Sequence, residues 1–379
     1  MYRLVQRRGI IGLFCLLFVA SSVVPGWAQK DNRFEVSKNL DIFNSLLKEV
    51  EMFYVDSVDV DKTVQRGIEA MLAGLDPYTE YYPEQKTEEL SLMTTGEYGG
   101  IGSLIRQRNN EGGVMIAEPT EGMPADLAGL KPGDLILAID TIDVSKATNS
   151  RVSELLKGVP NTKMVLTIQR PGEKKPRKFE ITRKQITTPQ VTYYGVKNDS
   201  IGYIYLKAFT IKSAQEVKEA FLDLKKNHNI KSLVLDLRGN GGGVLEGAVQ
   251  IVGMFVPKGS EVLSTKGKIK QWDRTYRTST EPLDTVMPLA ILINGGTASA
   301  AEIVSGSLQD MDRAVLVGQR SFGKGLVQAP RDLPYNGKVK ITMSKYYIPS
   351  GRCIQQIDYS HRKEDGSVAV SYTHLRAHE

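Results

Sequence analysis

The sequence predicts a layered α/β core that follows a β-rich segment and a small helical element. Residues 232–237 and 289–293 are almost unbroken apolar runs, which are typical of buried parallel strands. Glycines follow each run, and helical patterns come next at 245–255 and 301–308. Because strands and helices alternate in this way, we expect a sheet covered by helices within residues 184–370.

Residues 91–183 have a different character, in which short β-type runs alternate with turn signals. One helix is expected at 150–157, and the Gly-Glu-Lys-Lys-Pro stretch at 172–176 is expected to form a hairpin tip. The expected strands are 114–117, 135–139, 164–169 and 178–182. This segment is therefore predicted to be a separate β-rich domain inserted before the core.

Residues 31–90 are predicted to form a small helical element. One apolar side chain recurs every three or four positions through 34–53, as an amphipathic helix requires. A second helix is expected at 61–73, where Gly74 provides a C-terminal stop and Asp76-Pro77 opens a turn.

The first 28 residues resemble an export signal. Arg3, Arg7 and Arg8 form a positive segment, residues 10–20 are apolar, and small residues stand at Gly26 and Ala28. We expect an exported, periplasmic or cell-envelope protein whose signal segment is cleaved or retained as an anchor.

Composition excludes several classes of site. The net charge of +6 includes three arginines of the signal, and no basic stripe with interleaved aromatic residues predicts nucleic-acid binding. Beyond the signal, Cys353 is the single cysteine, and the four histidines form no metal motif, so neither a disulfide nor a metal site is expected. Residues 371–379 are interpreted as a non-native or disordered tail after a core that is cut short.

Ser299 is the best candidate for a nucleophile. A buried strand ends before it, Gly295-Gly296 permits a tight turn, and a helix begins directly after it. A helix N-terminus offers free N–H groups to an oxyanion. Serine is also a favoured N-terminal cap, so this segment alone leaves both roles open.

Lys324 is the best candidate for the base that such a serine needs. Only His228 and His361 lie in the body of the chain, and His228 stands in the polar stretch 225–229, so a histidine base is disfavoured. A lysine must be desolvated to be neutral near pH 7, and the glycines around Lys324 allow close backbone approach. If 325–328 is a strand, Gln328 shares a face with Lys324 and is placed to orient its amine.

Residues 318–324 also match the start of a nucleotide-binding Walker A motif. The final Ser/Thr is replaced by Gly325, and a strand is expected where that motif needs a helix. A nucleotide-binding protein is therefore disfavoured. The glycine run 239–243 lacks the dinucleotide-binding spacing and is expected to aim N–H groups at an oxyanion, above an Asp236–Arg238 pair.

Together these segments resemble the C-terminal processing (tail-specific) proteases, which are Ser–Lys serine proteases with a PDZ domain. The resemblance covers most of residues 35–360. It rests on 74–82 (GLDPYTEYY), 98–102 (YGGIG), 128–136 (AGLKPGDLI), 236–243 (DLRGNGGG), 297–302 (TASAAE) and 322–325 (FGKG) with Gln328.

The resemblance implies a role for each site residue. Ser299 is the implied nucleophile, Lys324 the general base and Gln328 its orienting residue. Ala300 N–H and an N–H of either Gly241 or Gly242 form the implied oxyanion hole. Gly100, Ile101 and Gly102 bind the substrate's C-terminal carboxylate, with Ile101 lining an apolar pocket.

The resemblance also implies a fold and partners. The core is similar to crotonase-like and Clp-type folds, and no metal or other cofactor is implied. The implied partners are protein substrates with free, apolar C-termini, together with a homo-oligomer or an adaptor protein. The alternative is a catalytically inactive scaffold whose PDZ domain binds peptides.

Overall fold

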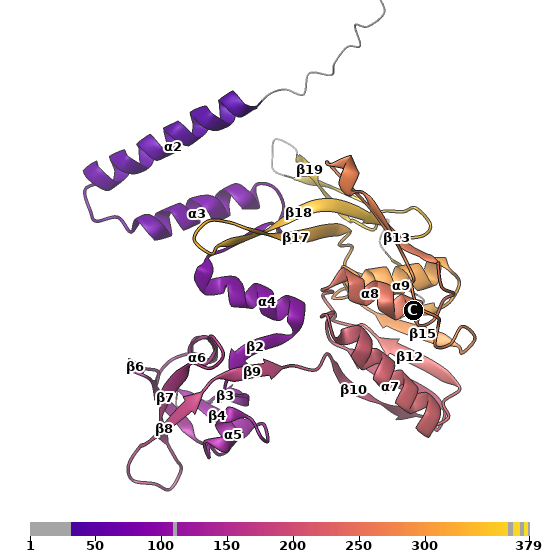
Figure 1. Ribbon diagram of the computed structural model, residues 1–379, viewed down its shortest axis with the longest axis horizontal. Helices are drawn as coiled ribbons and strands as arrows, with labels where there is room; N and C mark the ends of the chain where they lie inside the picture. The colour runs from indigo at the N-terminus through magenta and orange to yellow at the C-terminus, as the bar shows by residue number, and fades with distance from the viewer. Residues whose placement is uncertain (1–31, 109–111, 363–366, 372–374, 378–379) are drawn as a thin grey trace, which may run out of the picture. The chain divides into compact units, whose positions relative to one another are not determined.

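The computed structural model describes residues 32–108, 112–362, 367–371 and 375–377 (Figure 1). The expected signal segment at 1–28 lies outside the described residues. The chain divides into two compact units, residues 1–68 and 69–379. No helix among the described residues is both long and apolar enough to cross a membrane.

The predicted N-terminal helices are present. Helix α2 spans Arg33–Phe53 and α3 spans Val60–Ala73. None of the α2 side chains is buried, and Phe34, Leu40 and Phe53 are each more than half exposed. A 3-10 turn at Glu84–Lys86 and helix α4 (Thr87–Thr95) follow, and Gly96 ends α4 in the left-handed conformation that glycine favours.

The β-rich domain is built on one antiparallel sheet in the order β3-β4-β5-β7-β8, with β6 paired to β5. Its elements are β3 (Ser103–Gln107), β4 (Val114–Pro119), α5 (Pro124–Leu127), β5 (Leu135–Ile139), β6 (Ile142–Asp143), α6 (Asn149–Leu156), β7 (Lys163–Gln169) and β8 (Arg177–Thr182). All four predicted strands and the predicted helix are confirmed to within about two residues. Alternate strand residues such as Met164, Leu166 and Ile168 point into the buried core of this domain.

The strands that enter and leave this domain pair with each other in a two-stranded antiparallel ladder. Strand β2 (Glu97–Gly100) leads into the domain, β9 (Lys184–Thr187) leads out of it, and the two pair antiparallel. The Lys212 ammonium contacts the Glu97 carboxylate from the core side of this ladder.

The core contains the predicted sheet, in the order β10-β11-β12-β15-β16. Its strands are β10 (Val191–Lys197), β11 (Ile201–Leu206), β12 (Ser232–Asp236), β15 (Leu289–Ile293) and β16 (Val315–Gly318). All neighbours are parallel except β10 and β11.

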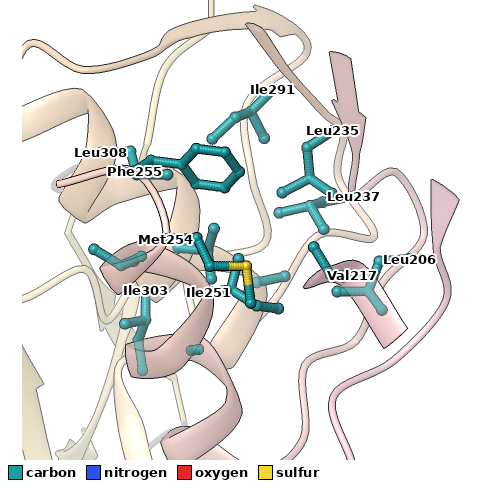
Figure 2. Close-up of a cluster of buried hydrophobic side chains, with 14 of the residues drawn as sticks. Leu206, Val217, Leu235, Leu237, Ile251, Met254, Phe255, Ile291, Ile303 and Leu308 are labelled. Carbon is teal, nitrogen blue, oxygen red and sulfur yellow. The ribbon is translucent and has the colours of Figure 1, made fainter. Parts of the chain in front are cut away.

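Helices α7 (Ser213–Asn227), α8 (Leu245–Gly253) and α9 (Ala300–Asp310) surround the buried apolar cluster of this core. Figure 2 shows side chains from strands and helices meeting there, among them Leu235, Ile251 and Ile303. Every residue of α9 from Ala300 to Leu308 is buried, because the helix contacts α8, β13 and β16.

A second, antiparallel sheet was not predicted. It runs β1-β18-β13-β14, and β17 also pairs with β18. Its strands are β1 (Glu80–Tyr82), β13 (Glu261–Gly267), β14 (Arg274–Arg277), β17 (Leu326–Asp332) and β18 (Lys338–Tyr347). A 3-10 turn at Lys270–Trp272 and a small pair, β19 (Ile357–Arg362) with β20 (Val368–Val370), complete the described elements. Leu375, from the expected tail, is buried in the core cluster.

Leu235→Ala should lower the free energy of unfolding of the core by about 2 to 5 kcal/mol, because Leu235 is fully buried in β12 and its loss leaves a cavity. Urea unfolding followed by the fluorescence of Trp272 measures this change. The matched Leu333→Ala, at a side chain 39% exposed, should change the same free energy by less than about 0.5 kcal/mol. Equal effects of the two substitutions would contradict this assignment of the core.

Candidate active site

Three loops meet at one edge of the parallel sheet. Strands β12, β15 and β16 are neighbours, so the loops at their carboxyl ends lie side by side. Hydrogen bonds join these loops: Ala298 N–H to the Asn240 carbonyl at 2.9 Å, and Phe322 N–H to the Thr297 carbonyl at 2.9 Å. The Asn294 side chain also accepts the Gly239 N–H at 2.9 Å. The segments that hold the predicted nucleophile, base and glycine turn are therefore brought together.

Ser299 occupies the residue before the first turn of α9, as predicted. It is half-buried and has φ 55° and ψ −118°, a left-handed backbone conformation that serine rarely adopts. Strain of this kind costs about 1 to 3 kcal/mol and concentrates at functional sites. The conformation distinguishes Ser299 from an ordinary helix cap.

Gly242 touches the nucleophile segment directly. It has φ 93°, and a Cβ atom there would lie 2.7 Å from Ser299 Cβ and 2.8 Å from Ala300 N. The Gly242 N–H donates to Asn240 Oδ1 at 2.9 Å. Gly241 adopts no positive φ, and no atom crowds the position of its missing Cβ. The two glycines therefore have different surroundings.

Glu302 links Ser299 to the loop that carries Lys324. Its side chain is completely buried. Oxygen Oε2 accepts the N–H groups of Ser299 and Lys324, both at 2.9 Å. Oxygen Oε1 accepts the Ser321 hydroxyl at 2.6 Å and the Gly323 N–H at 2.8 Å. One carboxylate thus fixes the main chain of both predicted catalytic residues.

Burial raises the pKa of the Glu302 carboxyl to about 7, while its four hydrogen-bond donors act in the opposite direction and favour the ionised form. The sequence alone predicted no role for Glu302. The signal for it was present, because a glutamate three residues after a serine at a helix start is the capping-box pattern.

Lys324 lies half-buried at the end of the third loop. Burial and the nearby Lys340 charge lower the pKa of its ammonium group, whereas Glu80, Asp76 and Glu302 act to raise it. The Nζ atom lies 4.4 Å from the centre of the Tyr78 ring. The Tyr346 hydroxyl contacts the Lys324 carbonyl at 2.8 Å and the Ser299 carbonyl at 3.1 Å. A lysine with a lowered pKa is the kind of base that the sequence predicted.

Gln328 lies near the start of β17, and its Nε2 donates to Thr342 Oγ1 at 3.2 Å. The strand begins at Leu326, and its pairing with β18 shifts register between Val327 and Gln328. The expected strand is thus present from Leu326 onward, but the irregularity before Gln328 interrupts the alternation on which a face shared with Lys324 depends. Among the described residues, no hydrogen bond links the side chains of Ser299, Lys324 and Gln328 to one another.

Two further expectations for this region are confirmed. Arg238 Nη2 lies 2.6 Å from Asp236 Oδ2, so these residues form a structural pair under the glycine turn. A strand rather than a helix follows Lys324, which removes the context that a Walker A motif requires.

The predicted carboxylate-binding loop lies at the end of β2. Gly102 has φ 66°, and a Cβ there would lie 2.4 Å from the Met123 side chain, so only glycine fits. The carbonyls of Ile101 and Gly102 accept the N–H groups of Ala125 and Thr120. Ile101 is only 3% exposed and packs into the core of the β-rich domain.

A pocket of about 380 Å³ opens beside the converging loops. Its lining includes Tyr78, Gly295, Phe322 and Gly323. A larger groove of about 800 Å³ lies between β13, β14, β17 and β18, and Thr342, the partner of Gln328, reaches its wall. No cluster of His, Cys, Asp or Glu among the described residues has the arrangement of a metal site.

Comparisons with known proteins identify the family of the chain. The model of Peptidase family S41 matches residues 200–360, and a PDZ domain model matches residues 115–170. A carboxy-terminal-processing protease of Bartonella bacilliformis is 36% identical over 345 residues, which cover 90% of this chain and 77% of that protein.

A probable CtpA-like serine protease of Staphylococcus aureus is 33% identical over 320 residues. The match covers 83% of this chain but 62% of that protein, so the chain spans less than two thirds of the staphylococcal relative. Among solved structures, a photosystem II D1 C-terminal processing protease is similar at 29% identity and a TM-score of 0.46, covering 83% of this chain and 89% of that one. The chain belongs to the carboxy-terminal-processing proteases of peptidase family S41, a family of serine peptidases, and contains their PDZ domain.

Proposed function

We propose that this protein is an exported serine endopeptidase that cleaves protein substrates near their C-termini through an acyl-enzyme. Ser299 is the nucleophile, Lys324 the general base and Gln328 the residue that orients the lysine amine. The PDZ domain binds the C-terminal carboxylate of the substrate. The observation that carries the proposal is the buried Glu302 carboxylate, which binds the N–H groups of both Ser299 and Lys324 at 2.9 Å.

The proposed first step is acylation. Neutral Lys324 takes the proton from Ser299 Oγ, and Oγ attacks the carbonyl carbon of the scissile peptide. The tetrahedral intermediate collapses when the amine leaves with a proton from Lys324. Water then attacks the ester while Lys324 removes its proton. As the bond between the acyl carbon and Ser299 Oγ breaks, Lys324 returns that proton to Oγ, which frees the acid product and the Ser299 hydroxyl. The lowered pKa of Lys324 supports this role, because a base must be partly neutral at the working pH.

Ala300 N–H and Gly241 N–H are the proposed oxyanion donors. Sequence alone left Gly241 and Gly242 open. The Gly242 N–H already donates to Asn240, which favours Gly241 as the donor. The close contact of Gly242 with Ala300 N supports a role for Gly242 as the spacer that lets the two donors face one site.

The proposed tail site is the loop Gly100–Gly102. Consecutive N–H groups in a glycine-rich loop can hold a carboxylate, and the left-handed φ of Gly102 is compatible with such a nest. Ile101 packs into the core of the β-rich domain and anchors the loop, so the expected apolar pocket is not lined by its side chain. Specificity for free C-termini then comes from the domain, and bond cleavage from the core.

Export is part of the proposal and rests on the sequence of residues 1–28. A homo-oligomer or an adaptor is also proposed, and the exposed apolar side chains of α2 support an additional protein contact. The second candidate function is a PDZ scaffold without catalysis, which the experiment below distinguishes.

Ser299→Ala and Lys324→Ala should each lower kcat/KM by roughly 10⁴-fold or more toward a model protein with an apolar C-terminal tail, because each removes an essential part of one mechanism. Cleavage is measured by mass spectrometry of the products. Both variants should still bind the tail peptide in a fluorescence anisotropy titration, since the PDZ loop is intact.

The same tail with an amidated C-terminus is the control for binding of the free carboxylate by the PDZ domain. Cleavage of the amidated substrate at an equal rate would contradict the proposed carboxylate site. Tail binding by the wild type without any cleavage would support the scaffold instead, and cleavage by Ser299→Ala would exclude Ser299 as the nucleophile.

Gly242→Ala should reduce kcat by roughly 100-fold or more, because its methyl group would displace Ser299 and the Ala300 N–H from the oxyanion site. Steady-state kinetics give the value, and thermal unfolding checks that the variant folds. Gly295→Ala is the matched control, since no atom lies within 4 Å of its added methyl group. An equally small effect of both substitutions would contradict the proposal that the close contact of Gly242 with Ser299 and Ala300 is needed for catalysis.

A further inference from the structure

The segment around Tyr78 lies directly against the proposed base, although the sequence offered it no function. The Lys324 ammonium is centred 4.4 Å from the Tyr78 ring. Tyr78 in turn meets the edge of Tyr359, with ring centres 6.1 Å apart and planes at 84°. A cation over an aromatic face is attracted to it, and more strongly where water is excluded.

The segment is held rigidly. Asp76, 7% exposed, accepts the N–H groups of Tyr78 and Thr79 at 2.8 Å and the Thr79 hydroxyl at 3.0 Å. Strand β1 follows immediately and pairs Glu80 with Lys340 of β18. The backbone that carries the Tyr78 ring is therefore fixed by hydrogen bonds both before and after Tyr78.

The same segment also reaches Gln328. Thr79 Oγ1 lies 3.3 Å from Thr342 Oγ1 and accepts the Thr342 N–H at 3.1 Å. Thr342 Oγ1 accepts Nε2 of Gln328 at 3.2 Å. A chain of hydrogen bonds thus runs from buried Asp76 through Thr79 and Thr342 to the residue that is proposed to orient the base.

We propose that Asp76–Thr79 is a positioning segment for the base, in which the Tyr78 ring holds the charged Lys324 side chain and Thr79 sets the position of Gln328. This inference rests on the proposed function. In the free enzyme the ammonium lies on Tyr78 and makes no hydrogen bond to Ser299. To act as a base, Lys324 must lose its proton and turn from the ring toward Ser299.

Besides the Tyr78 ring, several charged side chains influence the pKa of Lys324. Lys340 of β18 favours the neutral amine, as does burial. Glu80 of β1, Asp76 of the preceding turn and Glu302 of α9 favour the charged form. The ring face acts in the same direction as these carboxylates. Removing the ring should therefore lower the pH at which Lys324 becomes a base.

The pH dependence of kcat/KM tests the Tyr78 arm, because it reports the ionisation of the free enzyme. The rate rises as pH increases through the pKa of Lys324. In Tyr78→Leu this rise should move to lower pH by about half to one unit. Tyr78→Phe, which keeps the ring face, should retain the wild-type midpoint. Tyr78→Met is a second ring-free variant, for use if the leucine variant does not fold.

An unchanged midpoint in the folded ring-free variants overturns the Tyr78 arm, as does an equal shift in Tyr78→Phe. Lys324→Ala is assayed alongside over the same pH range. Activity that persists in Lys324→Ala with the wild-type midpoint overturns both the proposed base and this inference. Loss of activity in Lys324→Ala, with wild-type midpoints in all Tyr78 variants, overturns the inference alone.

Thr79→Val and Thr79→Ser test the other arm. The valine has nearly the same shape but lacks the hydroxyl that joins Asp76 to Thr342, so kcat should fall about fivefold while KM stays nearly constant. The serine restores the hydroxyl and should recover most of the rate. A fall of equal size in both variants, or a rise in KM without a change in kcat, would assign Thr79 a merely structural role.

Discussion

The arrangement of the site depends on one buried carboxylate. Glu302 stands in the first turn of α9, and its two oxygens accept four hydrogen bonds, three of which come from backbone N–H groups. A buried carboxylate is costly unless donors surround it, and here the donors belong to the segments that carry the proposed catalytic residues. The same hydrogen bonds therefore offset the cost of desolvating the Glu302 carboxylate and join the segments of the site to one another. Without this side chain, the loop after β16 would lose its three hydrogen bonds to the first turn of α9.

Tyr346 completes this arrangement from the opposite side of the backbone. Glu302 accepts the N–H groups of Ser299 and Lys324, and the Tyr346 hydroxyl lies against their two carbonyls. The main chains of both residues are thus fixed by two fully buried side chains. The Lys324 side chain has no such restraint toward Ser299 and rests on Tyr78 instead. The backbone of the site is therefore held in place by hydrogen bonds. The Lys324 side chain is the part that can change position when its charge changes.

Sequence reasoning succeeded where the determining interactions are local. The apolar runs of β12 and β15, the helices that follow them and the place of Ser299 before α9 all depend on neighbouring residues. It failed for the antiparallel sheet, whose strands mix polar and apolar residues and pair over long separations. Glu80 pairs with Lys340, for instance, and no local pattern specifies that partner. The roles of Tyr78, Thr342 and Tyr346 were missed for the same reason, because each acts through a residue that is distant in sequence.

The strained backbone of Ser299 and the glycine at position 242 both allow the start of α9 to approach the glycine turn closely. With Ser299 in the left-handed region, its Cβ and the Ala300 N–H face the glycine turn so closely that a Cβ atom at residue 242 would lie within 2.8 Å of each. A relaxed Ser299 would be more stable by about 1 to 3 kcal/mol, but the helix would then begin in another direction. The Glu302 contact to the Ser299 N–H and the burial of α9 from Ala300 to Leu308 oppose that relaxation. The packing of the core thus holds the proposed nucleophile and the proposed oxyanion donors in a geometry that the local chain would not adopt by itself.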